Sequence, residues 1–165
     1  MDDAGDRQYS RAPELEDLAS LCKALNDHRV RYVLIGGFAV ILHGYVRATK
    51  DIDFLVDPSE ENIAALKQAM SYLPDNAAEL IANDDVSTYQ VVRIADEIVV
   101  DLLASACGID YERAVGSGIE VRDIGGVEVP VASKQLLIET KQTMRPSDAA
   151  DVLFLRMRIV ADENS

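Results

Sequence analysis

Apolar residues along the first third of the chain recur with two different periods. Between residues 13 and 28 they return every three or four positions, which predicts an amphipathic helix with an apolar face of Leu15, Leu18, Leu21, Cys22 and Leu25. Two short and nearly continuous apolar runs, at residues 32–35 and 52–56, predict strands. Between them, Gly36-Gly37 ends the first strand and a short helical run at 38–43 follows.

The rest of the chain alternates between the same two patterns. Further helices are predicted at residues 57–73, 76–82, 111–115, 133–144 and 146–160, and further strands at 86–94, 98–103, 119–124 and 127–131. This order predicts an α/β (α+β) fold, with a mixed β-sheet flanked by helices and followed by C-terminal helices. We expect one domain at residues 12–161, after a loose polar N-terminus at 1–11.

The composition narrows the class of protein. The chain has 165 residues, with 16 Lys and Arg against 29 Asp and Glu, and a net charge of −13. Such a charge repels phosphate groups, which argues against strong non-specific DNA binding. The charge is uneven, however, because residues 130–160 carry a net +2 and the rest of the chain −15. The composition therefore stays compatible with an RNA end held beside the basic C-terminal helices.

Cysteine usage and hydropathy indicate the compartment. Cys22 and Cys107 have no paired spacing, so we interpret both as small buried hydrophobes in a reducing compartment and expect no zinc site. The acidic N-terminus lacks the apolar core of a signal peptide. No apolar run approaches the ~20 residues of a membrane helix. We therefore expect a cytoplasmic protein with no membrane partner.

Residues 33–56 and one later acid carry the candidate chemistry. Gly36-Gly37 lets the backbone approach a ligand closely, and free N–H groups at the start of the following helix suit a phosphate. Asp51 and Asp53 flank one strand residue, so their carboxylates point to the same face and can bridge two Mg²⁺ ions. Asp101 lies within the apolar run IVVDLLA, where an unpaired carboxylate is costly.

Each of these features also has a simpler interpretation. A Gly-Gly pair after a strand is typical of a plain tight turn. The pattern Asp-x-Asp/Glu is expected about three times by chance in so acidic a chain. Asp101 fits an edge-strand charge that blocks pairing with another strand.

The combination of these features resembles the DNA polymerase β-like nucleotidyltransferase superfamily. Its signature is a hydrophobic residue before Gly-Gly or Gly-Ser, a short spacer, Asp-hydrophobic-Asp/Glu-hydrophobic, and a third carboxylate on a later strand. Here Ile35-Gly36-Gly37 is followed by 13 residues and then Asp51-Ile52-Asp53-Phe54, and Asp101 is the third acid. The resemblance covers about residues 30–155 and implies the mixed-sheet core of that superfamily.

The segment GGFAVILHGYVRATKDIDFLV looks most like stand-alone bacterial AbiEii-type and MenT-type toxin-like nucleotidyltransferases. LLIETKQTMRPSDAADVLFL is similar to their lysine-then-paired-aspartate segment, which implies that Lys141 contacts the triphosphate and that Asp148 and Asp151 form a second motif. The alternative for Lys141 is an exposed helix lysine.

One position departs from the superfamily pattern. Many members have a Gly-Ser hydroxyl for the triphosphate where this chain has Gly37. Nucleotide contacts then fall to backbone N–H groups around Gly36 and Gly37 and to basic side chains, with Arg47 and Lys50 as candidates. The alternative for Arg47 and Lys50 is a solvated loop.

The resemblance implies a Mg²⁺-dependent enzyme that moves an NMP from an NTP, such as ATP, to a hydroxyl on a tRNA 3′ end or a protein. Asp51 and Asp53 would hold two Mg²⁺ ions, with Mn²⁺ as the alternative metal. Asp101 would hold the ion at the attacking hydroxyl and accept its proton, and without metal at least one of the three pKa values is expected to rise.

The resemblance also implies a physiological role, as the toxin of a toxin–antitoxin or phage-defence pair with an antitoxin protein as partner. Two alternatives stay open. One is a catalytically degenerate nucleotide- or partner-binding protein of the same fold, and the other is a small-molecule (antibiotic) nucleotidyltransferase.

Overall fold

The computed structural model describes residues 10–165, so residues 1–9 of the predicted loose N-terminus lie outside the described part. At the start of that part, the Ser10 hydroxyl donates to the Asp96 carbonyl oxygen at 2.6 Å. Arg11 forms ion pairs with Asp17 and Glu97. Among residues 10–165, no helix has the length and hydropathy needed to cross a membrane.

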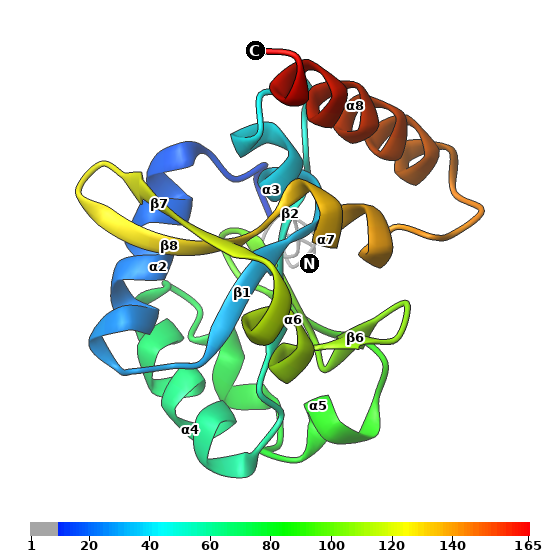
Figure 1. The fold of residues 1–165 in the computed structure, drawn as a ribbon. Helices are drawn as coiled ribbons and strands as arrows, with labels where there is room; N and C mark the ends of the chain where they lie inside the picture. Colours follow the sequence, from blue (N-terminus) through cyan, green and yellow to red (C-terminus); the bar gives the residue numbers. More distant parts are fainter. Residues whose placement is uncertain (1–9) are drawn as a thin grey trace.

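A six-stranded mixed sheet forms the centre of the fold (Figure 1), with the strand order β3-β4-β2-β1-β8-β7. The strands are β1 (Tyr32–Ile35), β2 (Asp51–Val56), β3 (Val92–Ala95), β4 (Val99–Leu103), β7 (Ile119–Ile124) and β8 (Val127–Ala132). The β2–β4 and β1–β8 pairs are parallel, and the other neighbours are antiparallel. A separate two-stranded sheet pairs β5 (Ser105–Ala106) with β6 (Ile109–Asp110).

Helices flank this sheet, which confirms the predicted fold class. They are α2 (Leu15–Asp27), α3 (Gly36–Leu42), α4 (Glu60–Ala69), α5 (Asp85–Thr88), α6 (Tyr111–Ser117), α7 (Lys134–Thr140) and α8 (Pro146–Glu163), with 3₁₀ turns η1 (Met70–Tyr72) and η2 (Ala77–Leu80). The C-terminal helices α7 and α8 pack together near α3 (Figure 1).

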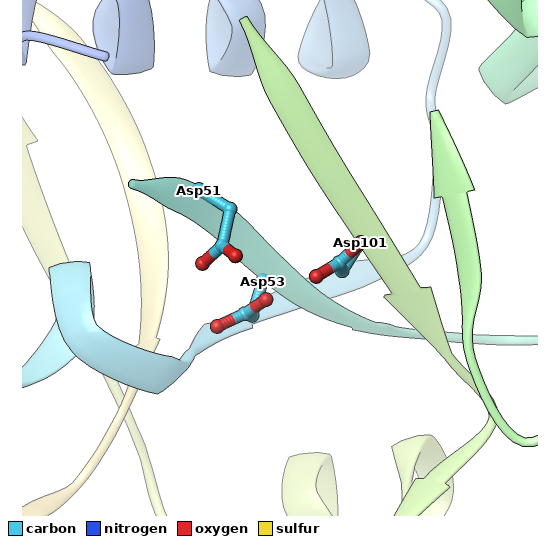
Figure 2. Close-up of side chains that lie close together, drawn as sticks. All are labelled: Asp51, Asp53 and Asp101. Atoms are coloured by element: carbon cyan, nitrogen blue, oxygen red, sulfur yellow. The ribbon is translucent and has the colours of Figure 1, made fainter. Parts of the chain in front are cut away.

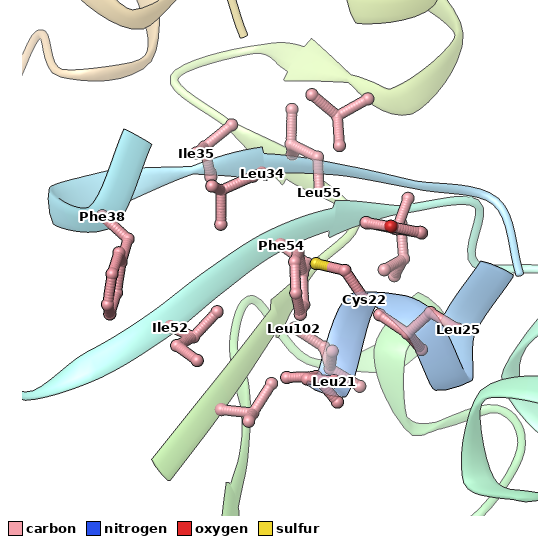
Figure 3. Close-up of a cluster of buried hydrophobic side chains, with 14 of the residues drawn as sticks. Leu21, Cys22, Leu25, Leu34, Ile35, Phe38, Ile52, Phe54, Leu55 and Leu102 are labelled. Carbon is pink, nitrogen blue, oxygen red and sulfur yellow. The ribbon is translucent and has the colours of Figure 1, made fainter. Parts of the chain in front are cut away.

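The hydrophobic core includes the layer in which α2 packs against the face of the sheet formed by β2 and β4. Ile52 and Phe54 of β2 are completely buried, and Figure 3 shows Phe54 beside Leu21 and Cys22 of α2. Burying a side chain of this size contributes about 1.5–3 kcal/mol, so the core face fixes the register of the strand. Because side chains alternate along a strand, residues 51 and 53 must leave the opposite face of the sheet.

The predicted strand at 86–94 is wrong over residues 86–91. Residues Asp85–Thr88 form the single-turn helix α5, and strand geometry begins only at β3. The hydroxyls of Ser87 and Thr88 both donate to the Asp84 carbonyl oxygen, at 2.9 and 2.8 Å. Short polar side chains that bond the local backbone in this way favour a helical turn over a sheet.

The structure departs from the sequence-based prediction in three smaller respects. The helix predicted at 133–144 ends at Thr140, where Lys141 becomes its C-cap. The short β5–β6 sheet was not expected. Cys22 is buried as predicted, whereas Cys107 is exposed in the tight β5–β6 turn.

Candidate active site

Three carboxylates from two neighbouring strands meet on one face of the sheet (Figure 2). Asp51 and Asp53 come from β2, and Asp53 is the parallel register partner of Asp101 on β4. One oxygen from each of the three residues can be chosen so that all lie within 4.8 Å of one another. Because β4 lies between β3 and β2, the interpretation of Asp101 as an edge-strand charge is wrong.

Glycine at position 36 lets the backbone between β1 and α3 lie in close contact with the Asp53 carboxylate. Its φ is +75°, and a Cβ at this position would overlap Asp53 Oδ2 and lie 2.8 Å from both Asp53 Cβ and Cγ. No other residue type fits such a conformation and contact together. Gly36 is therefore part of the acidic site, and the interpretation as a plain tight turn is too simple.

Burial and mutual repulsion raise the pKa values of the two β2 acids, Asp51 and Asp53. Desolvation, followed by the charges of Asp51 and Asp101, raises the pKa of Asp53 from 3.8 to about 7. Desolvation and then the charge of Asp101 raise the pKa of Asp51 as well. This confirms that crowding the three acids without metal raises at least one pKa.

Arg93 is the cation closest to this cluster, and the sequence interpretation did not single it out. Its Nε and Nη2 donate to the two Asp101 oxygens, both at 2.9 Å, and Nη2 also donates to Asp51 at 3.2 Å. The hydrogen bond to Asp101 raises the pKa of Arg93 above its ordinary value. Arg93 could have been found by pairing the two predicted strands about Glu97, since β3 and β4 place Arg93 opposite Asp101.

A second cluster of charges lies beside the acids, at the junction of α7 and α8. Lys141, with only 7% of its surface exposed, pairs with Asp148 at 3.4 Å and with Asp151 at 3.0 Å, so the alternative of an exposed helix lysine is wrong. Arg145 pairs with Asp148 at 3.0 Å. Although burial opposes it, a hydrogen bond from Thr143 and the Lys141 charge hold the pKa of Asp148 below its usual value.

Arg47 joins this cluster from the loop before β2. Its Nε and Nη2 donate to the two oxygens of the fully buried Asp151, at 2.9 and 3.0 Å. A Cβ at Gly37 would lie 2.7 Å from Arg47 Nη1 and 2.8 Å from Thr49 Oγ1. The side chains of this loop thus fill the space that a residue larger than glycine would need at position 37.

Two clefts meet at the cluster. The first has a volume of about 190 Å³ and is lined by Gly36, the three aspartates, Lys141 and Arg145, among others. The second, of about 650 Å³, contains Arg11 and Lys50. Both include Asp51 and Arg93. Of the predicted nucleotide-binding residues, Gly36 and Lys141 thus lie at the first cleft and Lys50 at the second, while Arg47 bonds to Asp151.

The donor set in the first cleft fits a divalent metal. Carboxylate oxygens are the ligands that Mg²⁺ and Mn²⁺ prefer, and Asp51, Asp53 and Asp101 offer them from two strands of one rigid sheet. Two metal ions about 3.5–4 Å apart are the usual way in which proteins use such a set for phosphoryl chemistry. The raised pKa of Asp53 also indicates a carboxylate that lacks sufficient positive charge around it.

Comparisons with known proteins indicate the family and the fold of this chain. A protein-family model described as "Nucleotidyltransferase of unknown function (DUF6036)" matches residues 14–97, which include Gly36, Asp51 and Asp53. A protein from Thermotoga maritima, described as a candidate nucleotidyltransferase, superposes with a TM-score of 0.55 at 16% identity, over 87% of this chain and 91% of the other.

A second solved structure is an antigenic nucleotidyltransferase-like protein from Paracoccidioides brasiliensis. It superposes with a TM-score of 0.51 at 17% identity, over 88% of this chain and 77% of the other. No curated protein matches this chain in sequence. The two solved structures share the fold of this chain.

Proposed function

The chain belongs to the DUF6036 family of nucleotidyltransferases, and on that premise we propose that it is a divalent-metal-dependent enzyme that transfers an NMP from an NTP to a hydroxyl acceptor. The observation that carries this proposal is the meeting of Asp51, Asp53 and Asp101 within 4.8 Å in a cleft that also contains Lys141. A domain without catalytic turnover has no physical reason to crowd three carboxylates and to raise the pKa values of Asp51 and Asp53.

The residues that line the first cleft would have different roles in such a transfer. Asp51, Asp53 and Asp101 would hold the metal ions, Mg²⁺ or Mn²⁺, and bound metal would supply the positive charge that nucleotidyl transfer requires. Lys141 and Arg145 face the cleft and would bind the phosphate oxygens of the NTP. The backbone at Gly36 would allow a phosphate to approach closely.

Asp101 would accept the proton of the acceptor hydroxyl. The hydroxyl oxygen attacks the α-phosphorus, the bond between that phosphorus and the bridging oxygen breaks, and pyrophosphate leaves. Asp101 is 6% exposed and is held by its strand neighbours, so its carboxylate has little freedom to leave this position.

The acceptor in this proposal is a tRNA 3′ end or a protein hydroxyl, and the enzyme acts as a toxin that an antitoxin protein restrains. The likeness of the segments around Asp51 and Lys141 to AbiEii-type and MenT-type proteins supports this role. A second support is the cleft beside Asp51, where Lys50 offers positive charge in an otherwise acidic chain, whereas the charge of Arg11 is balanced by Asp17 and Glu97.

The test is label transfer from each α-labelled NTP in turn, with Mg²⁺ or Mn²⁺ and with total tRNA or cell extract as the acceptor. We expect transfer that EDTA abolishes and that Asp53→Asn reduces by about 10²-fold or more. Asp27→Asn is the matched control, because Asp27 is an exposed acid on α2 that pairs only with Lys23 among the described residues.

The outcome also decides between this proposal and its alternatives. Transfer to neither tRNA nor protein, with tight nucleotide binding, would favour a binding protein of the same fold. Transfer to an aminoglycoside or another small hydroxyl compound alone would favour a small-molecule nucleotidyltransferase. Transfer that is unchanged in Asp53→Asn would contradict the site.

A further inference from the structure

Arg93 donates hydrogen bonds to carboxylate oxygens that would bind the metal in the candidate site. Its guanidinium binds both Asp101 oxygens at 2.9 Å and reaches Asp51 at 3.2 Å, so it already bridges two of the three carboxylates. A divalent ion that takes an oxygen from each of these carboxylates meets the guanidinium in the same space. The like charges of metal and guanidinium also repel each other at such distances.

The hold of Arg93 on the carboxylates is weak enough to be broken. Its side chain is 60% exposed and comes from the edge strand β3, so solvent can reach it. The Arg93–Asp51 pair is screened by solvent, because its side chains are 60% and 27% exposed, whereas the buried Asp101 would exchange the guanidinium for a divalent ion that carries twice its charge. The metal is therefore expected to win this competition once it is present.

The other cations of the cleft have partners that a metal would leave in place. Lys141 pairs with Asp148 and Asp151, and Arg145 pairs with Asp148, none of which belongs to the three-acid cluster. Among the described cations lining the first cleft, Arg93 alone is held by the metal-binding carboxylates. Metal binding would thus free one guanidinium at the mouth of the cleft.

We propose that Arg93 and the divalent metal compete for Asp51 and Asp101, and that the guanidinium released by the metal binds the triphosphate of the incoming nucleotide. A guanidinium matches phosphate oxygens with two parallel hydrogen bonds, as it does the Asp101 carboxylate. Metal binding and nucleotide binding are then positively coupled through one side chain. This inference rests on the proposed function, since it assigns the metal to these carboxylates.

The first test measures Mn²⁺ binding to the metal-free protein by calorimetry at low salt, without nucleotide. We expect Arg93→Gln to bind Mn²⁺ about fivefold more tightly than the unchanged protein, which corresponds to about 1 kcal/mol. Arg93→Lys, which keeps the charge but loses the two-pronged contact, should fall between the two. Arg113→Gln is the matched control, because Arg113 is similarly exposed (57%) and pairs with Glu139 outside the cleft.

The second test measures the binding of each α-labelled NTP at saturating Mn²⁺. We expect Arg93→Gln to weaken binding about tenfold for the nucleotide that the unchanged protein prefers, and Arg113→Gln to leave it unchanged. The metal-free Arg93→Gln variant should also have a lower Tm, because Asp51 and Asp101 lose their counter-charge, and Mn²⁺ should raise that Tm more than in the unchanged protein.

The outcomes separate this inference from the proposed function. If Arg93→Gln binds Mn²⁺ no more tightly than the unchanged protein, the competition is wrong. If its metal affinity rises while nucleotide binding stays the same, the transfer of the guanidinium to the triphosphate is wrong. If the unchanged protein and Asp53→Asn bind Mn²⁺ equally, the metal site itself is wrong and the proposed function fails with it.

Discussion

Asp53 and Asp101 are register partners across the parallel strands β2 and β4, so their carboxylates leave the sheet side by side. The residues on either side of Asp53, Ile52 and Phe54, pair with Val100 and Leu102, and all four of these apolar side chains are buried. The same core that fixes the strand register therefore forces the acids together. The site is built into the sheet, and its electrostatic strain cannot relax by a loop movement.

The pKa of Asp53 predicts how this strain depends on pH. Because folding raises that pKa from 3.8 to about 7, the folded state favours the protonated acid. The contribution of this pKa shift to the free energy of unfolding is present in full below about pH 4 and is lost as the pH rises through about 7. The shift corresponds to about 4 kcal/mol at most.

We therefore expect Asp53→Asn to raise the Tm of the metal-free protein by several degrees at pH 8 and by much less at pH 5. Thermal unfolding in EDTA measures this. The control Asp27→Asn should show the same small change at both pH values. A Tm gain for Asp53→Asn that does not depend on pH would contradict the assignment of the strain to Asp53.

The affinity for metal should rise with pH as Asp53 loses its proton, over the same pH range in which the stability of the metal-free protein falls. Mn²⁺ needs the ionised carboxylate, so its binding must release the proton that Asp53 holds below about pH 7. Calorimetry in two buffers of different ionisation enthalpy should show close to one proton released at pH 6 and fewer at pH 8. An absence of proton release at pH 6 would show that Asp53 is not a ligand.

Gly36→Ala tests the close approach of the backbone to the acids. Gly36 and Gly108 both have positive φ, +75° and +82°, but a Cβ at Gly108 meets nothing within 4 Å, whereas one at Gly36 overlaps the Asp53 carboxylate. We expect Gly108→Ala to cost about 1–2 kcal/mol from backbone strain alone. Gly36→Ala should cost more and should also weaken Mn²⁺ binding, which urea unfolding and calorimetry measure. Equal effects of the two changes would contradict a packing role for Gly36.

The sequence predicted the acidic half of the site because strand periodicity is a local property. Asp51 and Asp53 share a face in any strand, and the apolar run around Asp101 needs no knowledge of its neighbours to be read as a strand. Arg93 was missed because its role depends on the register of the β3–β4 hairpin, which the periodicity of each strand taken alone does not give. Lys141 was predicted only from the family resemblance, because its spacing along the chain does not reveal that α8 would bury it against Asp151.

The error at residues 86–94 has a different cause. Val86 is buried as a strand residue would be, but it lies on a helical turn that the hydroxyls of Ser87 and Thr88 close on Asp84. Hydrophobic alternation cannot distinguish a short buried turn from a short buried strand. In such segments the side-chain-to-backbone hydrogen bonds decide, and they become visible only in the structure.

Gly37→Ser would introduce the hydroxyl that many superfamily members have, and we expect it to be harmful in this chain. The new Cβ would lie 2.7 Å from Arg47 Nη1 and 2.8 Å from Thr49 Oγ1, so the loop before β2 must move. We expect a loss of about 1–3 kcal/mol in urea unfolding, as for other overpacked sites. Combining it with Thr49→Ala should recover part of the loss. A serine variant as stable as the unchanged protein would show that the loop accommodates the hydroxyl.

Asp151→Asn tests whether the buried charges of α8 organise the nucleotide-binding cations. Asp151 is fully buried and balances both Arg47 and Lys141. Removing one partner of a buried ion pair costs about 3–5 kcal/mol, because the remaining charge is left desolvated.

We expect Asp151→Asn to lose about 3 kcal/mol in urea unfolding, since Arg47 is partly exposed and can reach water. Asp162→Asn, on the same helix, is the matched control: its pair with Lys134 at 3.1 Å is half exposed and should contribute at most about 1 kcal/mol. The Asp151 variant should also bind NTP more weakly, because Lys141 lines the first cleft and loses the shorter of its two ion pairs. If the two variants lose equal stability and keep equal nucleotide affinity, Asp151 has no organising role.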